Sequence, residues 1–145
     1  MTIYLIRHAQ SQYNAFGTLV PNVELSEYGK TQASKLKGNP DLIIVSPLRR
    51  AIDTLNLSQI ECDNILVTHL CKERLDGNII NHFENDQPSI ETDSEFEERI
   101  KKFKELLDEK SKIYKEIYVI THALFINALT KVGVVGNCHK LLYKL

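Results

Sequence analysis

Three short apolar runs recur along the chain, and they predict buried strands. The runs span residues 3–6, 42–45 and 117–120 and consist mostly of isoleucine, leucine and valine. Continuous runs of this kind are typical of strands that helices cover on both faces of a sheet. The pattern therefore indicates three strands at the centre of an α/β structure.

Amphipathic segments between these runs predict helices. Ser26 is suited to cap a helix that extends to about Lys37, with the following glycine as its stop. Ser46 is suited to cap a second helix over residues 47–57, with proline at its first position. Both helices would connect one strand of the sheet to the next.

The second half of the chain continues the alternation of strands and helices. Residues 94–97 have the spacing of a capping box, and an apolar helical stripe follows. That stripe comprises Phe96, Ile100, Phe103, Leu106 and Leu107. Residues 65–68 and 140–145 predict two further strands, the second at an edge, and residues 124–129 another helix. With no repeat or linker, residues 1–145 are expected to form a single α/β domain.

Basic side chains follow each of the three buried strands: Arg7 and His8 the first, Arg49 and Arg50 the second, and His122 the third. Parallel strands joined by helices bring their carboxyl ends to one edge, where α/β proteins bind ligands. Imidazole can act as a nucleophile, and guanidinium suits phosphate. These residues predict an anion site, although a solvated arginine and a satisfied histidine would explain the first pair taken alone.

Five motifs follow one another from near residue 2 to near residue 130. They are Leu5-Ile6-Arg7-His8-Ala9-Gln10-Ser11 with Asn14, Leu25-Ser26-x-x-Gly29-x-x-Gln32-Ala33, Ser46-Pro47-Leu48-Arg49-Arg50-Ala51-x-x-Thr54, Leu70-Cys71-Lys72-Glu73 and Ile120-Thr121-His122-Ala123. In this order they resemble the motifs of the histidine phosphatase superfamily, which includes the cofactor-dependent phosphoglycerate mutases. The resemblance implies a phosphoglycerate mutase-like, three-layer sandwich with a mostly parallel central sheet flanked by helices.

The same resemblance implies roles for individual residues. His8 would be the nucleophile that becomes transiently phosphorylated, and Glu73 the proton donor. The groups implied to hold the phosphoryl oxygens are Arg7, Asn14, Arg50, His122 and Ala123. Arg50 takes the family role because it directly precedes the alanine of its motif, which leaves Arg49 as a solvated helix residue. No cofactor and no metal are expected. Two departures are that Ala9 and Ala123 stand where the family usually has glycine.

The charges around the implied site affect its proton chemistry. Neighbouring arginines are expected to lower the pKa of His8, which favours the neutral form that can attack. The same cations are expected to lower the pKa of Glu73, which opposes its use as a proton donor. Bound phosphate would offset this by placing negative charge beside the carboxylate. We therefore expect Glu73 to donate a proton chiefly in the substrate complex.

Composition and charge limit the classes of partner that are expected for this chain. The chain has 145 residues and a formal net charge of −1, which gives no electrostatic case for nucleic-acid binding. No apolar stretch approaches the roughly 20 residues of a membrane span, and no charged region precedes the first apolar run, so a cytoplasmic protein without membrane contact is expected. The three cysteines, Cys62, Cys71 and Cys138, are odd in number and irregularly spaced, which indicates reduced thiols. The oligomeric state is left open.

The segment from 76 to 93 bears on the substrate. It contains five acidic residues and no Lys or Arg. It is also short, whereas mutases carry a large insertion here that closes over the site. An open site with an acidic rim would disfavour bisphosphates and suit a small phosphoester or a phosphoprotein. A solvated acidic loop is an equally good interpretation.

Three functions fit these observations. A phosphatase that uses a phosphohistidine on His8 is the best supported. The alternatives are a phosphoglycerate mutase-type phosphotransferase with the same intermediate and a catalytically idle module that binds phosphate. The intact set of nucleophile, cations and acid argues against the idle module.

Overall fold

Strands and helices alternate along most of the chain in the computed structural model, which describes residues 1–87 and 89–145. The strands are β1 (Thr2–Arg7), β2 (Lys37–Gly38), β3 (Leu42–Val45), β4 (Gln59–Ile60), β5 (Ile65–Val67), β6 (Glu116–Thr121) and β7 (Lys140–Tyr143). The α-helices are α1 (Gln12–Phe16), α2 (Glu27–Ser34), α3 (Arg49–Leu57), α4 (Asp93–Ser111) and α5 (Ala123–Thr130). Two 3₁₀ turns, η1 (His69–Cys71) and η2 (Ile79–Asn81), lie between β5 and α4.

The central sheet has the strand order β5-β3-β6-β1-β7. Strands β5, β3, β6 and β1 run parallel, and β7 pairs antiparallel with β1 at the edge. The three apolar runs form β1, β3 and β6, the inner strands of this sheet. The mostly parallel sheet and its last edge strand are both confirmed.

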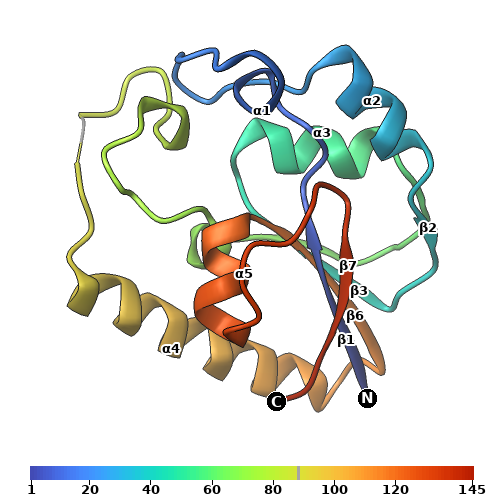
Figure 1. The fold of residues 1–145 in the computed structure, drawn as a ribbon. Coiled ribbons are helices and arrows are strands. Elements are labelled where there is room, and N and C mark those ends of the chain that lie inside the picture. Colours follow the sequence, from blue (N-terminus) through green and yellow to red (C-terminus); the bar gives the residue numbers. More distant parts are fainter. Residues whose placement is uncertain (88) are drawn as a thin grey trace.

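Helices cover both faces of the sheet (Figure 1). On one face α4 and α5 pack Phe103 and Phe125 against Leu5 and its neighbours. On the other face α3 packs Ala51 against Val45, and α2 lies against α3. The predicted three-layer α/β sandwich is therefore confirmed, and the apolar stripe of α4 is part of its core.

Helix α2 is shorter than the sequence predicts. It is capped by Ser26 as expected, but it ends at Ser34, and Gly38 lies in a strand that pairs with β4. A Cβ at Gly38 would lie 2.2 Å from the Tyr118 hydroxyl oxygen, and its φ of 155° is unfavourable for other residues. The glycine therefore allows close strand packing and does not stop the helix.

Two other helix starts were placed wrongly by the sequence. Helix α3 begins at Arg49, and its N-cap is Leu48, which has no polar side chain and so makes no capping bond. The Ser46 hydroxyl instead accepts from the Leu48 amide at 3.3 Å and lies 2.8 Å from Nε2 of His122. Helix α4 begins at Asp93, because the capping box is formed by Thr92 and Glu95 rather than by residues 94–97.

Replacing Phe103 with alanine is expected to destabilise the fold by about 3–5 kcal/mol. Phe103 is fully buried and meets Phe125 edge to face with ring centroids 5.1 Å apart, so its removal leaves a cavity between α4 and α5. Urea unfolding followed by circular dichroism measures the loss. A cost below about 1 kcal/mol would contradict this packing.

Two further expectations concern the whole chain. Cys62, Cys71 and Cys138 are all free thiols. Within the part of the chain that the structure describes, no helix has the length and apolar character needed to cross a bilayer.

Candidate active site

The ends of three strands meet at one edge of the sheet. Strand β6 lies between β3 and β1, with Arg7 opposite Thr121 and Val45 opposite Ile120. The residues that follow these strands, His8, Ser46 and His122, are therefore brought together. The predicted convergence of basic strand ends is confirmed.

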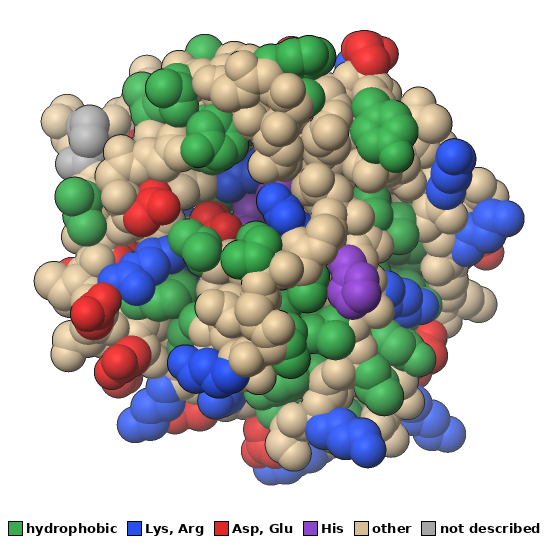
Figure 2. All heavy atoms as spheres, viewed as in Figure 1, with side chains coloured by type: hydrophobic (Ala, Val, Ile, Leu, Met, Phe, Trp, Pro, Cys, Tyr) green, Lys and Arg blue, Asp and Glu red, His purple; other side chains and the backbone are tan. Residues whose placement is uncertain are grey.

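A cavity of about 210 Å³ opens at this edge. It is lined by Arg7, His8, Ser11, Tyr13, Asn14, Arg50, Glu73, Asp76, Asn78, Ile80, Asn81 and Leu124. Figure 2 shows a hollow in this face of the molecule with basic, acidic and histidine side chains at its floor. Five of the seven residues predicted for the site line the cavity. His122 is fully buried beside it, with its ring centroid 5.1 Å from that of His8.

His8 has one nitrogen held by the backbone and the other available. Its Nδ1 lies 2.6 Å from the Ala9 carbonyl oxygen, and its Nε2 lies 3.4 Å from the Nε of Arg50. Because the carbonyl requires a donor and the arginine requires an acceptor, this network assigns the neutral tautomer with its lone pair on Nε2. Burial first, and then Arg50 and Arg7, hold the pKa of His8 well below its usual 6.5. The predicted direction is confirmed, with burial as the larger cause.

Arg50 is almost fully buried and is fixed by the segment around η2. Its Nη1 donates to the Ile80 carbonyl at 3.0 Å and its Nη2 to the Asn81 Oδ1 at 2.6 Å. Burial lowers the pKa of Arg50 to about 10, while Glu73 acts to raise it, so the guanidinium stays charged at neutral pH. Arg49 is exposed and pairs with Glu24, as expected of a solvated helix residue.

Glu73 is buried against the first turn of α5. Its carboxylate accepts hydrogen bonds from the backbone amides of Arg74, Leu124 and Phe125 at 3.0–3.1 Å. The pKa of Glu73 is nevertheless raised, because burial outweighs these amides and the charge of Arg50. The charge of Arg50 lowers this pKa as expected, but the net shift is upward because the cost of desolvation is larger.

Two buried nitrogens at the site have no hydrogen-bond partner among the residues that the structure describes. Arg7 donates from Nη1 to the Val135 carbonyl at 2.7 Å, but its Nε is unpaired. His122 lies 2.8 Å from the Ser46 hydroxyl through Nε2, and its Nδ1 is unpaired. Burial lowers the pKa of His122 well below 6.5. Buried polar atoms normally have a partner, so these atoms are available to a ligand.

Asn14 and Ala123 complete the predicted set. Asn14 forms a capping box with Ser11 at the start of α1, and its Oδ1 also accepts a bond from Asn137. Ala123 begins α5 and does not line the cavity. The Ala123 amide is one of the free donors in the first turn of that helix. The next two amides, those of Leu124 and Phe125, donate to Glu73.

Several positioning residues were missed by the sequence interpretation. Thr54 accepts a bond from the Ala9 amide, and Asn137 donates to the His8 carbonyl. Arg99 on α4 donates to the Glu73 carbonyl and pairs with Glu91 at 2.8 Å. Apart from the Arg99–Glu91 pair, these bonds join segments far apart in the chain, which no local pattern reports.

The acidic rim is smaller than the sequence suggests. Of the five acidic residues in the segment 76–93, only Asp76 lines the cavity. Glu91 binds Arg99 instead, and Asp93 pairs with Arg74.

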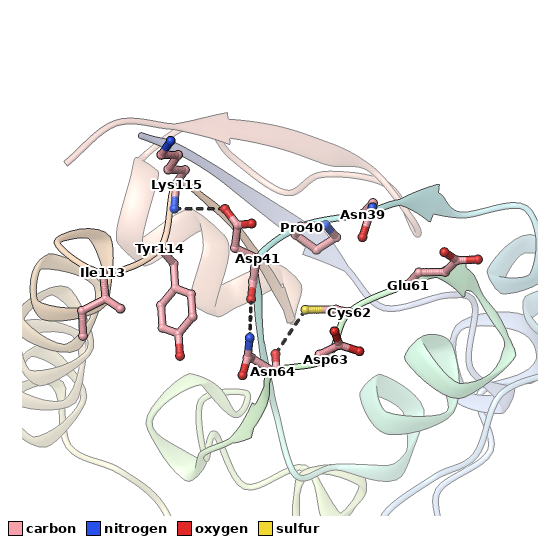
Figure 3. Close-up of a pocket in the computed structure, with 10 residues that line it drawn as sticks. All are labelled: Asn39, Pro40, Asp41, Glu61, Cys62, Asp63, Asn64, Ile113, Tyr114 and Lys115. Carbon is pink, nitrogen blue, oxygen red and sulfur yellow. Dashed lines mark hydrogen bonds between the residues drawn. The ribbon is translucent and has the colours of Figure 1, made fainter.

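A larger cavity of about 640 Å³ lies at the other edge of the sheet, where β3, β5 and β6 begin (Figure 3). Its carboxylate Asp41 accepts bonds from the Lys115 and Glu116 amides, and its thiol, Cys62, is bonded to the Asn64 carbonyl. None of the predicted site residues lies there. Across residues 1–87 and 89–145, no group of three or more His, Cys, Asp or Glu side chains could hold a metal ion.

The buried neutral histidines are expected to make the fold sensitive to acid. Below pH 6.5 the unfolded chain binds protons at His8 and His122 that the folded chain excludes, so stability falls as the pH falls. Each histidine contributes a slope of up to about 1.4 kcal/mol per pH unit in that window. Urea unfolding of His8→Gln should show a shallower slope than the unchanged protein, and equal slopes would contradict the burial of a neutral His8. The raised pKa of Glu73 acts in the opposite direction in both proteins.

Comparison with known proteins gives consistent results. The family model of the histidine phosphatase superfamily (branch 1) matches residues 3–76. A protein of Hydrogenobacter thermophilus named "Putative phosphoserine phosphatase 2" is 28% identical over 88% of this chain and 75% of the relative.

Solved structures share the fold. A phosphoserine phosphatase from Entamoeba histolytica, in complex with 3-phosphoglyceric acid, superposes with a TM-score of 0.70 at 21% identity, over 99% of this chain and 90% of that one. The alpha-ribazole phosphatase of Shigella flexneri gives a TM-score of 0.68 at 22% identity, over 89% and 77% of the two chains. The phosphoglycerate mutase-like fold is thereby confirmed.

Proposed function

This chain belongs to the histidine phosphatase superfamily, and we propose that it hydrolyses phosphomonoesters or phosphoprotein groups through a phosphohistidine on His8. The observation that carries the proposal is the state of His8: neutral, with Nδ1 held by the Ala9 carbonyl and the Nε2 lone pair beside Arg50. A nucleophile attacks through such a lone pair. The neighbouring cation stabilises the negative charge of the phosphate that is attacked.

In the first step His8 Nε2 attacks the phosphorus atom. The N–P bond forms while the bond from phosphorus to the leaving oxygen breaks, and Glu73 gives its proton to that oxygen. The raised pKa of Glu73 supports this role, because it keeps more of the carboxyl protonated before substrate arrives.

In the second step water attacks the phosphohistidine. Glu73, now a carboxylate, accepts a proton from the water as the N–P bond breaks, and the electron pair returns to Nε2. Inorganic phosphate leaves and the neutral His8 is restored. No cofactor enters this cycle.

The cations hold the transferred group between these steps. Arg50 and Arg7 supply guanidinium donors, and the unpaired Nδ1 of His122 and Nε of Arg7 supply further contacts. Asn14 and the Ala123 amide are the remaining candidates. Phosphoryl transfer requires mainly such positioning and charge stabilisation on the equatorial oxygens.

The names of the similar proteins support phosphorylated substrates. They name phosphoserine and alpha-ribazole phosphatases. The simplest test is hydrolysis of p-nitrophenyl phosphate by the purified chain. Release of nitrophenol and phosphate in equal amounts is expected, and no turnover would leave the phosphate-binding module as the better description.

Glu73→Gln is expected to slow the reaction more strongly for poor leaving groups than for good ones. Glutamine keeps the size of the side chain, and its one oxygen can still accept from the Phe125 and Arg74 amides, but it loses the bond from the Leu124 amide and has no acid proton to donate. We expect a loss of about 10²–10⁴-fold for an alkyl phosphate and a smaller loss for p-nitrophenyl phosphate. Measuring kcat for aryl phosphates of graded leaving-group pKa tests this, and an equal loss across the series would argue against proton donation.

A further inference from the structure

Three segments that line the catalytic cavity or contact Arg7 and His8 carry no charged side chain. Residues 9–23, 77–83 and 132–138 contain no Asp, Glu, Lys or Arg, although such residues make up 26% of the chain. These segments supply Tyr13, Asn78 and Ile80 to the cavity, and the third provides the Val135 carbonyl that binds Arg7. The charged residues that line the cavity are Arg7, Arg50, Glu73 and Asp76, and the three segments add an uncharged surface beside them.

Exposed apolar side chains lie on these segments and next to the cavity. Phe16, Leu19, Val20, Ile79, Ile90, Leu124, Val132 and Val134 form what we call the apolar rim, and each is between 37% and 76% exposed. Ile79 lies between two lining residues, Ile90 bridges to Asp76, and Leu124 lines the cavity itself. Figure 2 shows hydrophobic side chains above and below the hollow. Exposed apolar patches of this kind mark protein contact sites.

The cavity has room for a small phosphoester and little beyond it. Its volume of about 210 Å³ lies below the roughly 300–1,000 Å³ of pockets that enclose a drug-sized ligand. A larger substrate therefore extends onto the apolar rim. A sugar phosphate gains little there, and a second anionic group finds no cation on the three segments. An uncharged apolar surface resembles the core of a protein interface, where charged residues are depleted.

We propose that the substrate of this site is a phosphorylated protein segment with apolar residues flanking the phosphorylated side chain, which dock on the apolar rim. The inference rests on the proposed phosphatase function and names its substrate class. The phosphorylated side chain enters the cavity towards His8, and its neighbours in sequence contact rim residues that include Leu19, Val20 and Val134.

The test uses peptides with a central phosphoserine, phosphotyrosine or phosphohistidine, flanked either by leucine and valine or by glutamate and lysine. For at least one phosphorylated residue, kcat/KM for the apolar peptide should exceed that for its charged counterpart by about tenfold or more. The double variant Leu19→Glu, Val134→Glu should remove this advantage and leave the hydrolysis of p-nitrophenyl phosphate within about twofold. Ile113→Glu is the matched control, since Ile113 is 67% exposed at the opposite edge of the sheet (Figure 3) and should change neither substrate.

The outcomes separate this inference from the function on which it rests. If p-nitrophenyl phosphate is not hydrolysed, the proposed function fails. If it is hydrolysed and the apolar peptides have no advantage, or the double variant keeps that advantage, the inference is overturned and the phosphatase stands. Analytical ultracentrifugation gives one more contradicting result: a dimer that Val134→Glu dissociates would make the apolar rim a contact between two copies.

Discussion

His8→Ala is expected to lower kcat for p-nitrophenyl phosphate by at least about 10³-fold, to the limit of detection. Alanine removes the only group proposed to form a bond to phosphorus, and water alone would have to attack the bound phosphate. Because the cations remain, phosphate binding should survive. A variant that binds inorganic phosphate and does not turn over is therefore predicted, and it is measured by calorimetry together with a phosphate-release assay.

The control for this variant is His69→Ala. His69 is exposed on η1 and does not line the cavity, so its loss should change kcat by less than about twofold. Persistent turnover in His8→Ala would assign the chemistry to another group, whereas loss of both binding and fold would call for the more conservative His8→Asn.

Arg50→Ala is expected to reduce kcat/KM for p-nitrophenyl phosphate by about 10³-fold, with most of the loss in kcat. Its guanidinium lies beside His8 Nε2 and is held there by the Ile80 carbonyl and by Asn81. Charge builds up on the equatorial oxygens in the transition state, so a cation fixed at that position contributes more there than in the ground state. Steady-state kinetics across a range of substrate concentrations gives the division between kcat and KM.

Its neighbour supplies a matched control. Arg49→Ala removes an exposed guanidinium that pairs with Glu24, and activity within about twofold of the unchanged chain is expected. Arg50→Lys should recover only part of the loss, because an ammonium cannot reproduce the planar fork. Equal effects at the two positions would contradict the assignment.

Continuous apolar runs were sufficient to predict the inner strands of the sheet. The runs at residues 3–6, 42–45 and 117–120 are apolar on both faces, and only strands covered by two helical layers meet that requirement. The basic residues after them could be assigned to one edge because parallel strands place their carboxyl ends together. The strand order could not be predicted from the sequence. In the structure β6 lies between β1 and β3.

Helix boundaries were harder to predict because capping residues compete with tertiary contacts. Ser46 is a good cap by type, but its hydroxyl lies against the buried His122. Thr92 rather than Ser94 caps α4, and Gly38 serves the close approach of Tyr118 instead of ending a helix. In each case local preference was overruled by a residue distant in sequence.

The motif residues of the site could be predicted, but their supports could not. Arg7, His8 and Arg50 belong to contiguous motifs, whereas Asn81 and Arg99 act through bonds to segments many residues away. The pKa of Glu73 was misjudged for the same reason. Charge could be counted from the sequence, but the burial that outweighs it is a property of the fold.

The central claim is a covalent bond between His8 and the phosphoryl group, and it can be observed directly. The protein is mixed with excess p-nitrophenyl phosphate, quenched within milliseconds in alkali, which preserves phosphohistidine, and digested for mass spectrometry. The account predicts one added phosphoryl group on the peptide that contains His8, formed and lost at rates consistent with kcat and increased by Glu73→Gln if dephosphorylation becomes slower. A phosphoryl group on any other residue, or none at all during active turnover, would contradict it.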